Sequence, residues 1–298
     1  MLLRRGIFYM ATMLGVILLI GIIVNIVCYL FQINLSSSGM GTILVLSAVM
    51  GFAGSIISLF LSKTMVKKSM RVQVITSPST EDERWLLQSV SMLAKKKGVA
   101  MPEVGIYPAD EMNAFATGWN KDAALVAVSS GILRRMNRDE LLAVLGHEMS
   151  HVQNGDMVTM ALMQGVVNTF VYALSYIIAQ AASGMLRSDR DDERGGGNFM
   201  LFYLLQNVLQ MVFGFFGTLA VLWFSRHREY AADAGSAQVL GKERMIAALE
   251  ALDSQRFDEK KTATMQALCI AAPKEPSELL MSHPTIKNRV DALRRLPY

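Results

Sequence analysis

The chain contains 298 residues, of which 52% are hydrophobic and only 18% are charged. Soluble domains carry about 25% charged residues, so this composition excludes a disordered or collagen-like protein and indicates a membrane protein. The net charge of +4 is small, and no segment interleaves basic with aromatic residues, so nucleic acid is not expected as a partner. Two cysteines, Cys28 and Cys269, are too few for a disulfide framework or a zinc ribbon.

Four uncharged runs are long enough to cross a bilayer as helices, which requires about 20 residues. They comprise residues 7–31, 40–62, 157–186 and 199–225. The apolar part of the first run is too long for a secretory signal, and we interpret it as a retained anchor. The third and fourth runs contain Asn and Gln, so they are either spans that pack together through polar side chains or partly buried helices of the water-facing body. Their uncharged length favours spans.

Basic residues at the ends of these runs predict the orientation, because Lys and Arg collect on the cytoplasmic side. They precede the first run and follow the second and the fourth: Arg4, Arg5, Lys63, Lys67, Lys68, Arg71, Arg226 and Arg228. We therefore expect both termini and the segments 63–156 and 226–298 in the cytoplasm. Residues 1–62 then form an anchor with two transmembrane helices, and residues 157–225 form a transmembrane hairpin that interrupts one cytoplasmic domain.

The pattern changes after the second run. Residues 72–75 predict a short strand that ends before Pro78, and Thr80 is the expected N-cap of a helix with acidic residues in its first turn. This helix should end at Gly98. The lysines at 95–97 are expected to cap the helix and to face water, with a weaker potential to contact anionic lipid.

The remaining water-facing segments predict a mixed but mainly helical body. Short β-rich runs occupy residues 104–107 and 123–128, and a helix is expected over 137–155. Beyond the fourth run, the pattern is helical over 225–252, and a last helix is expected near 284–293. The predicted fold class is α+β, mostly α.

The motif His147-Glu148-Met149-Ser150-His151 lies on the helix expected over 137–155. Residues four apart share a helix face, so both imidazoles can reach one metal ion while Glu148 projects toward the water that such an ion activates. The alternative is that both histidines only cap or fill the structure. The chain has just four histidines, and two of them stand here at the spacing of a zinc site, which favours the metal.

A catalytic zinc site usually has three protein ligands, so a third is required. The candidates are His227, Glu229, Asp233 and His283. Glu229 and Asp233 are four apart on a helix, so one could bind the metal while the other orients a ligating histidine. Two alanines between them would allow their helix to approach the one that bears His147. The alternative is an ordinary solvated acidic face.

These motifs together resemble those of the HtpX heat-shock membrane metalloproteases, which are grouped with the CAAX prenyl endopeptidases in one gluzincin family. The resemblance lies in residues 147–151, in Asn-Gly-Asp at 154–156, in 226–233 and in Asn-Ala-Phe-Ala-Thr-Gly at 113–118, and it extends over essentially the whole chain. It implies a gluzincin-like fold, that is, a zincin catalytic domain interrupted by transmembrane helices, with four spans in total. Residues 63–156 and 226–298 would form this catalytic domain.

The resemblance also implies roles for individual residues. His147, His151 and Glu229 would bind one Zn²⁺ per chain, and Glu148 would act as general base. Asp233 would not bind the metal but would contact and orient the ligand His147. Residues expected to pair with the substrate backbone as an edge strand are Asn113, Ala114, Phe115 and Ala116. The late motif that contains His283 and Arg289 resembles one near the family's active site, where His283 would stabilise the oxyanion or hold the two acidic side chains in place. Thr285 stands where the family motif often has a second proline.

The resulting hypothesis is an integral zinc metalloendopeptidase of the bacterial inner membrane. The resemblance implies that it cleaves misfolded or damaged membrane proteins at the cytoplasmic face, as part of protein quality control under stress. The expected partners are protein substrates and the lipid bilayer, and the sequence does not define an oligomeric state. Two alternatives are a processing protease like the prenyl endopeptidases and a non-enzymatic scaffold braced by metal; a bracing site would not require Glu148.

Overall fold

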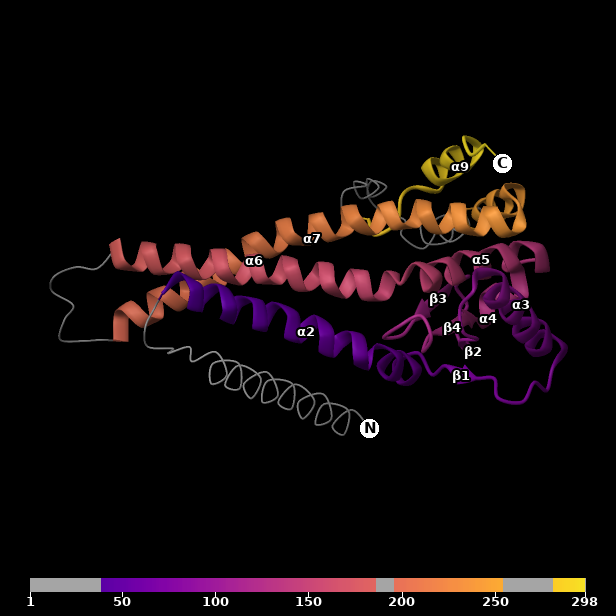
Figure 1. The fold of residues 1–298 in the computed structure, drawn as a ribbon, viewed down its shortest axis with the longest axis horizontal. Helices are drawn as coiled ribbons and strands as arrows, with labels where there is room; N and C mark the ends of the chain where they lie inside the picture. The colour runs from indigo at the N-terminus through magenta and orange to yellow at the C-terminus, as the bar shows by residue number, and fades with distance from the viewer. Residues whose placement is uncertain (1–38, 186–195, 254–280, 298) are drawn as a thin grey trace, which may run out of the picture. The chain divides into compact units, whose positions relative to one another are not determined.

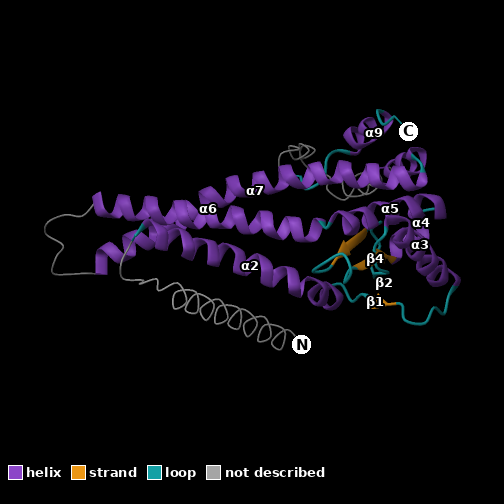
Figure 2. Cartoon of the chain, in the orientation of Figure 1, coloured by secondary structure: helices purple, strands orange, loops and turns teal. Residues whose placement is uncertain are grey.

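The computed structural model describes residues 39–185, 196–253 and 281–297. The apolar run at 7–31 and both cysteines lie outside the described residues. Within them, the chain forms two compact units (Figures 1 and 2). One comprises the described parts of Met1–Ser58 and Ala161–Val221, and the other those of Leu59–Met160 and Leu222–Tyr298.

Three long apolar helices run through the described residues. They are α2 (Met40–Ser69), α6 (Asp156–Met185) and α7 (Gly196–Leu240). Each has the length and hydropathy of a membrane span: Gly41–Ser69, Asp156–Gly184 and Phe199–Leu240. The second, third and fourth apolar runs of the sequence are therefore helices, as predicted.

The helical pattern predicted over 225–252 is confirmed, although no boundary lies at residue 225 and the helix is interrupted at Gly241. Helix α7 continues without a break through this point and is 45 residues long. Between 225 and 233 the chain has neither proline nor glycine, and Arg, Glu and Ala favour helices, so no residue there ends the helix. The fourth apolar run and the acidic residues that follow it are therefore parts of one rigid element.

The first unit is held together by close contacts between small residues. A Cβ atom placed on Gly51 of α2 would lie 2.5 Å from the Thr169 hydroxyl oxygen of α6, and one on Gly165 would lie 2.5 Å from the Phe52 ring. Gly217 of α7 stands equally close to Val167. Helix pairs that approach in this way through glycine are typical of membrane proteins, in which packing rather than hydrophobic burial drives helix association.

The second unit is built on a small mixed sheet with the order β1-β2-β4-β3. The strands are β1 (Gln73–Val74), β2 (Glu103–Tyr107), β3 (Ala114–Thr117) and β4 (Leu125–Ser129). The two β-rich runs of the sequence are therefore strands, within two residues of the predicted ends, whereas β1 is shorter than expected. β4 is fully buried and lies parallel to β2 and antiparallel to β3, which leaves β3 at one edge of the sheet.

Helix α3 (Glu81–Lys97) is defined by its local sequence at both ends. Thr80 and Glu83 form a reciprocal capping box, and Gly98 ends the helix in a left-handed conformation, as predicted. The expectation that all three terminal lysines face water was wrong for Lys97, which is only 6% exposed. Its ammonium group donates hydrogen bonds to the Ser150 hydroxyl at 2.8 Å and to the Gly235 carbonyl oxygen at 2.9 Å. Lys97 therefore joins α3 to two further helices.

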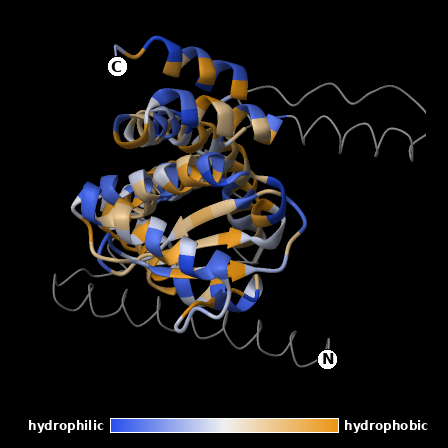
Figure 3. Ribbon diagram, turned by 90° about the vertical axis from the view of Figure 1, so that its right-hand side faces the viewer, coloured by the Kyte–Doolittle hydropathy of each residue, from blue (hydrophilic) through white to orange (hydrophobic). Residues whose placement is uncertain are grey.

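The remaining helices complete a single core around the sheet. They are α4 (Ser130–Arg135), α5 (Arg138–Asn154), a helix over 242–253 that follows α7 at Gly241, and α9 (Ile286–Arg294). Buried side chains of α3, α5, β4, the 242–253 helix and α9 belong to one apolar cluster. Figure 3 shows the strands of this unit mostly in hydrophobic colours and α9 with alternating hydrophobic and hydrophilic segments. The last helix is thus amphipathic and packs on this core.

Candidate metal centre

Helix α5 presents two imidazoles to one point. Its N-terminus is fixed by a capping box between Asn137 and Glu140, and it ends at Gly155 in a left-handed conformation. Within this helix the Nε2 atoms of His147 and His151 lie 3.1 Å apart. The four-residue spacing therefore places both rings on one face, as predicted.

Glu229 of α7 completes a triangle of ligand atoms. Its Oε2 atom lies 3.4 Å from His147 Nε2, and its Oε1 atom lies 3.3 Å from His151 Nε2. Tetrahedral zinc with bonds of about 2.0–2.1 Å requires ligand atoms about 3.3 Å apart. Each carboxylate oxygen lies at about this distance from one imidazole nitrogen, and His147, His151 and Glu229 thus form a group that could hold a metal ion.

The burial of Glu229 supports this interpretation. The side chain is 2% exposed, and three imidazole nitrogens lie 2.8–3.4 Å from its two oxygens. A buried carboxylate is costly unless hydrogen bonds or a cation balance its charge. Two neutral nitrogen ligands and one carboxylate, with further space beside them, match the donor set of catalytic zinc sites.

A carboxylate contacts the Nδ1 atom of each imidazole, on the side of the ring opposite the candidate metal position. His147 Nδ1 lies 2.8 Å from Asp233 Oδ1, and His151 Nδ1 lies 2.5 Å from Asp156 Oδ2. These contacts fix the tautomer that turns each Nε2 toward the metal. Asp233 was expected in this role from the sequence, whereas Asp156 was not, although Asp156 directly follows the Gly155 helix end and begins α6.

Arg289 of α9 holds Asp233 with two hydrogen bonds. Its Nε and Nη2 atoms donate to the two carboxylate oxygens at 2.8 Å and 2.6 Å. The planar guanidinium fits a carboxylate in this two-point geometry. Arg289 therefore supports the residue that orients His147, and its Nη1 atom lies 3.8 Å from Glu229 Oε2.

The other two candidates for the third ligand occupy different places. His283 Nδ1 lies 2.8 Å from Glu229 Oε2, and its side chain is 60% exposed. Thr285, which replaces the second proline of the family motif, is the N-cap of α9. His227 is exposed on the opposite part of the helix surface, with its ring 4.3 Å from that of Trp223, and it takes no part in the site.

Close contact between α5 and α7 brings the two halves of the site together. The Ser236 hydroxyl donates to the Ala143 carbonyl oxygen at 2.7 Å, and a Cβ atom on Gly146 would lie 2.6 Å from that hydroxyl. Of the two alanines between the acidic residues, Ala232 is fully buried, whereas Ala231 is exposed. Small residues therefore do allow the approach, but only one of the two expected alanines contributes.

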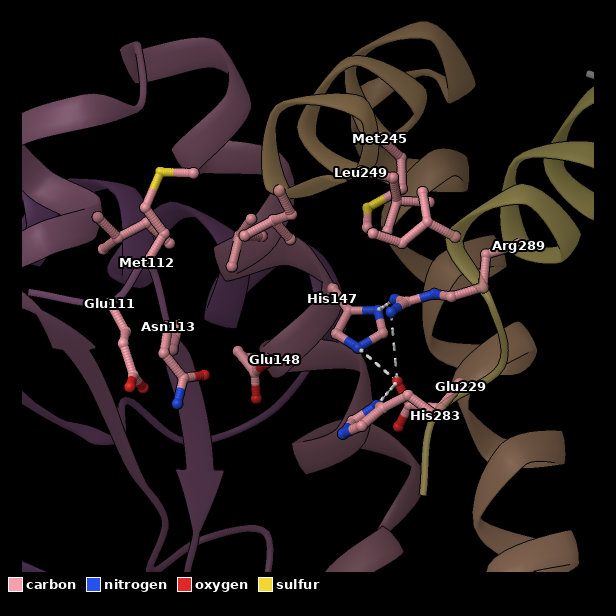
Figure 4. A pocket seen from close by; sticks show the side chains of 15 residues that line it. Glu111, Met112, Asn113, His147, Glu148, Glu229, Met245, Leu249, His283 and Arg289 are labelled. Atoms are coloured by element: carbon pink, nitrogen blue, oxygen red, sulfur yellow. Dashed lines mark hydrogen bonds and ion pairs between the residues drawn. The ribbon is translucent and has the colours of Figure 1, made fainter. Parts of the chain in front are cut away.

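Glu148 lines a cavity of about 390 Å³ together with His147 and Glu229. Figure 4 shows it between Asn113 and the His147 ring. Burial raises the pKa of Glu148, and the two imidazoles and a hydrogen bond with the backbone of Ala116 offset this only in part. Glu148 is thus a carboxylate beside the candidate metal position, with its affinity for a proton increased.

The edge strand forms one side of this cavity. Asn113 and Ala114 line it, and Phe115 and Ala116 follow them on β3. In the described sheet β3 pairs with β4 alone, so one row of its backbone groups has no strand partner. The opposite side is apolar and consists of side chains from α5, the 242–253 helix and α9: Val144, Met245, Leu249, Leu252 and Ile286.

Two imidazoles and a carboxylate at zinc spacing, beside a carboxylate with a raised pKa, define the metal-dependent hydrolases of the His-His-Glu type. Residues 80–296 match Peptidase family M48, and the chain belongs to this family. The chain is therefore a metalloprotease, and peptidases of this family depend on a metal ion.

Individual relatives cover nearly the whole chain. The chain is 48% identical to Protease HtpX of Aliivibrio fischeri over 98% of its length and 100% of the relative's. It is 45% identical to Protease HtpX of Klebsiella pneumoniae, over 97% of both chains. These bacterial relatives and the three candidate spans indicate a protein of the bacterial inner membrane.

A solved structure shares the fold. Ste24p of S. mikatae superposes with a TM-score of 0.62 at 17% identity, over 92% of this chain and 61% of that one. At this identity the likeness concerns the fold alone. It agrees with the relationship between HtpX proteases and prenyl endopeptidases that the sequence motifs indicated.

Proposed function

We propose that this protein is a zinc metalloendopeptidase that cleaves misfolded or damaged membrane proteins at the cytoplasmic face of the membrane. The observation that carries the proposal is the group of His147, His151 and Glu229, in which the two Nε2 atoms lie 3.1 Å apart and each lies 3.3–3.4 Å from one Glu229 oxygen, with a carboxylate bound to Nδ1 of each imidazole. We assign one Zn²⁺ per chain to this group. A gluzincin-type domain formed by residues 63–156 and 226–298, and four spans in total, belong to the same proposal.

Bound zinc would polarise the scissile carbonyl group and make a water molecule easier to deprotonate. Glu148 is assigned the role of general base, which takes a proton from the attacking water and then passes it to the leaving amine. Its raised pKa suits this task, because a base is most effective when its pKa lies near the working pH. Asp233 and Asp156 accept the Nδ1 proton of the two imidazoles, so Nε2 is the atom left to bind the metal and each ring is held in orientation.

The substrate backbone is assigned to the unpaired edge of β3. There it would pair with residues 113–116 and add one strand to the sheet. This edge borders the cavity that contains Glu148, so a peptide bond held there would lie beside the base. An apolar substrate side chain would fit against Val144, Met245 and Leu249. Binding would therefore depend on backbone hydrogen bonds more than on a particular sequence.

His283 and Arg289 are assigned supporting roles. The ion pair between His283 and Glu229 favours the role of holding Glu229 in place over oxyanion stabilisation. The exposed side chain of His283 nevertheless borders the cavity, so the second role is open to test. Arg289 acts through Asp233 and is a positioning residue.

The decisive experiment is cleavage of an unfolded reporter by detergent-purified protein, compared with Glu148→Gln at equal bound zinc. We expect the variant to retain zinc and to lose about 10²–10⁴-fold in kcat, the range typical of general base catalysis. Equal cleavage by both proteins would show that a contaminant is responsible and would overturn the assignment of Glu148. A single cleavage site in many different reporters would favour a dedicated processing protease over quality control.

A further inference from the structure

Two large aromatic side chains lie exposed beside each other, away from the metal centre. Trp119, in the turn between β3 and β4, is 44% exposed, and Phe60 of α2 is 57% exposed. Their ring centroids are 5.7 Å apart. Aromatic surface of this size in contact with water is unfavourable, so a stable arrangement that leaves both rings outside suggests a further partner.

The turn that carries Trp119 is held in a defined conformation. Gly118 has φ = 147°, and a Cβ atom there would lie 2.7 Å from the Ala123 carbonyl oxygen, so only glycine fits without strain. On the other side of the tip, the Asn120 side-chain oxygen accepts a hydrogen bond from the backbone N–H of Asp122 at 2.8 Å. This geometry presents Trp119 at the tip of the hairpin.

The hairpin is also fixed to the end of α2. Lys63 Nζ lies 2.8 Å from Glu103 Oε1 and donates to the Ala123 carbonyl oxygen at 3.4 Å. Lys67 forms a second ion pair with Glu103. Phe60 stands one turn before Lys63, in the apolar part of the candidate span Gly41–Ser69. Trp119 is thus held beside the part of α2 in which the apolar residues end and the lysines begin.

We propose that the β3–β4 hairpin tip rests in the membrane interface, with the Trp119 ring inserted at the boundary between headgroups and acyl chains. Trp is enriched at this depth because its ring is apolar and its N–H group can bond to water or lipid. Exposed Lys121 adds a cation at the tip beside Asp122, from which it can reach the phosphates. The partner is the lipid bilayer, because the patch continues the apolar surface of a candidate span.

This placement has a consequence for substrates that rests on the proposed function. β3 ends at Thr117, only two residues before Trp119. The edge strand to which we assign the substrate backbone would therefore begin at the membrane surface. Polypeptide that emerges from the bilayer could then pair with it directly, whereas a soluble protein would first have to reach the membrane.

The three tryptophans of the chain provide the test with its own controls. Single-tryptophan variants retain Trp119, Trp85 or Trp223, with phenylalanine at the other two positions, and each is reconstituted into phosphatidylethanolamine–phosphatidylglycerol vesicles with and without brominated acyl chains. Trp85 in α3 lies 5.7 Å below the Arg138 guanidinium and is the negative control, whereas Trp223 lies in a candidate span, is 55% exposed and is the positive control. Zinc content equal to that of the wild type confirms that each variant is folded.

We expect bromine near the headgroup to reduce Trp119 emission about as much as it reduces Trp223 emission, and to leave Trp85 emission unchanged. Trp119 emission that is as insensitive to bromine as that of Trp85 would overturn the proposal. Quenching that depends on the protein-to-lipid ratio would indicate a second copy as the partner and would also overturn it. These outcomes do not depend on catalysis, so failure of the proposed function is a separate result.

A second readout tests the consequence for substrates. Trp119→Ser should lower the cleavage of a reporter tethered to the vesicle and leave cleavage of the same reporter in solution unchanged. An equal reduction for both reporters would mean that Trp119 acts only through folding of the hairpin. Trp119→Phe should restore part of the difference, because phenylalanine keeps the apolar ring without the N–H group.

Discussion

Helices α5 and α7 both supply metal ligands, but their sequences define them in different ways. α5 is 17 residues long, has a capping box at one end and a left-handed glycine after the other, and carries both histidines within one turn. α7 is 45 residues long and passes from an apolar segment to Glu229 and Asp233 without any boundary. The position of the ligands on α5 follows from local signals, whereas Glu229 reaches them only because α7 packs closely on α5.

One part of the metal centre is therefore determined by local sequence, and the other part is determined by tertiary packing. Helix geometry places the two histidines on one face of α5. The distances from Glu229 to their Nε2 atoms depend on Gly146, Ser236 and Ala232, which set the separation of the helices. Substitutions in the two parts should therefore affect metal binding and stability in different proportions.

The largest effect is expected for the ligands themselves. His151→Ala and Glu229→Ala should each leave less than one zinc per chain after dialysis and abolish cleavage. Glu229→Ala should in addition lower the melting temperature of the metal-free protein, because the neighbouring imidazoles outweigh burial and hold the pKa of the Glu229 carboxyl well below its usual range, so the fold loses a stabilised carboxylate. Zinc analysis by mass spectrometry and thermal melting with chelator measure both quantities. Full zinc retention in Glu229→Ala would contradict the assignment.

The carboxylates behind the imidazoles should have intermediate effects. Asp156→Asn and Asp233→Asn should each weaken zinc binding by about 10–100-fold, as is common for such partners. Asp233→Asn should also destabilise the fold by about 3–5 kcal/mol, because it leaves Arg289 buried without its carboxylate. Competition with a fluorescent chelator and denaturant unfolding separate the two effects. Equal stability of both variants would argue against the distinct role of Arg289.

The contact between the helices can be tested at Gly146. Gly146→Ala should destabilise the protein by about 1–3 kcal/mol and weaken zinc binding, because the new methyl group would meet Ser236 Oγ at 2.6 Å and Leu240 Cδ1 at 2.9 Å. Gly54→Ala is the matched control, since nothing lies within 4 Å of a Cβ atom at that helical position. If Gly146→Ala changed neither quantity, helix separation would not determine the position of Glu229.

The smallest effect is expected at Lys97, which joins both helices through Ser150 and Gly235. Burial lowers the pKa of Lys97 to about 8, below the ordinary lysine value of 10.5 that applies in the unfolded chain. Between these values the unfolded chain binds the extra proton, so stability should rise as the pH increases from about 8 to 10.5. Lys97→Met should remove this rise, which melting temperatures across that range would reveal. An unchanged pH profile would assign the rise to another group.

Most secondary structure could be predicted from the sequence because its signals are local. Thr80, Gly98, Asn137 and Gly155 define the ends of two helices through caps that involve only their own neighbours. The change from apolar to charged residues near residue 225 alters the environment of α7 without ending it. The environment of a side chain, unlike a cap, depends on what packs against it.

The same distinction applies to the site. The His-Glu-x-x-His spacing indicated a metal, and helical periodicity placed Asp233 on the same face as Glu229. The role of Asp156 was missed, although its position directly after the Gly155 helix end was visible. Lys97 was placed in water because three consecutive lysines at a helix end usually face solvent, and only the structure reveals the Ser150 and Gly235 acceptors beside it.

The sequence by itself determined the apolar helices, the capped α5 helix with its two histidines, and the class of chemistry, because each depends on spacing along the chain. Only the tertiary structure decided which acidic residue completes the triangle, which carboxylate stands behind each imidazole, and that Trp119 lies against Phe60. These contacts join residues far apart in sequence. They arise from packing between elements, for which the periodicity of a single helix or strand carries no information.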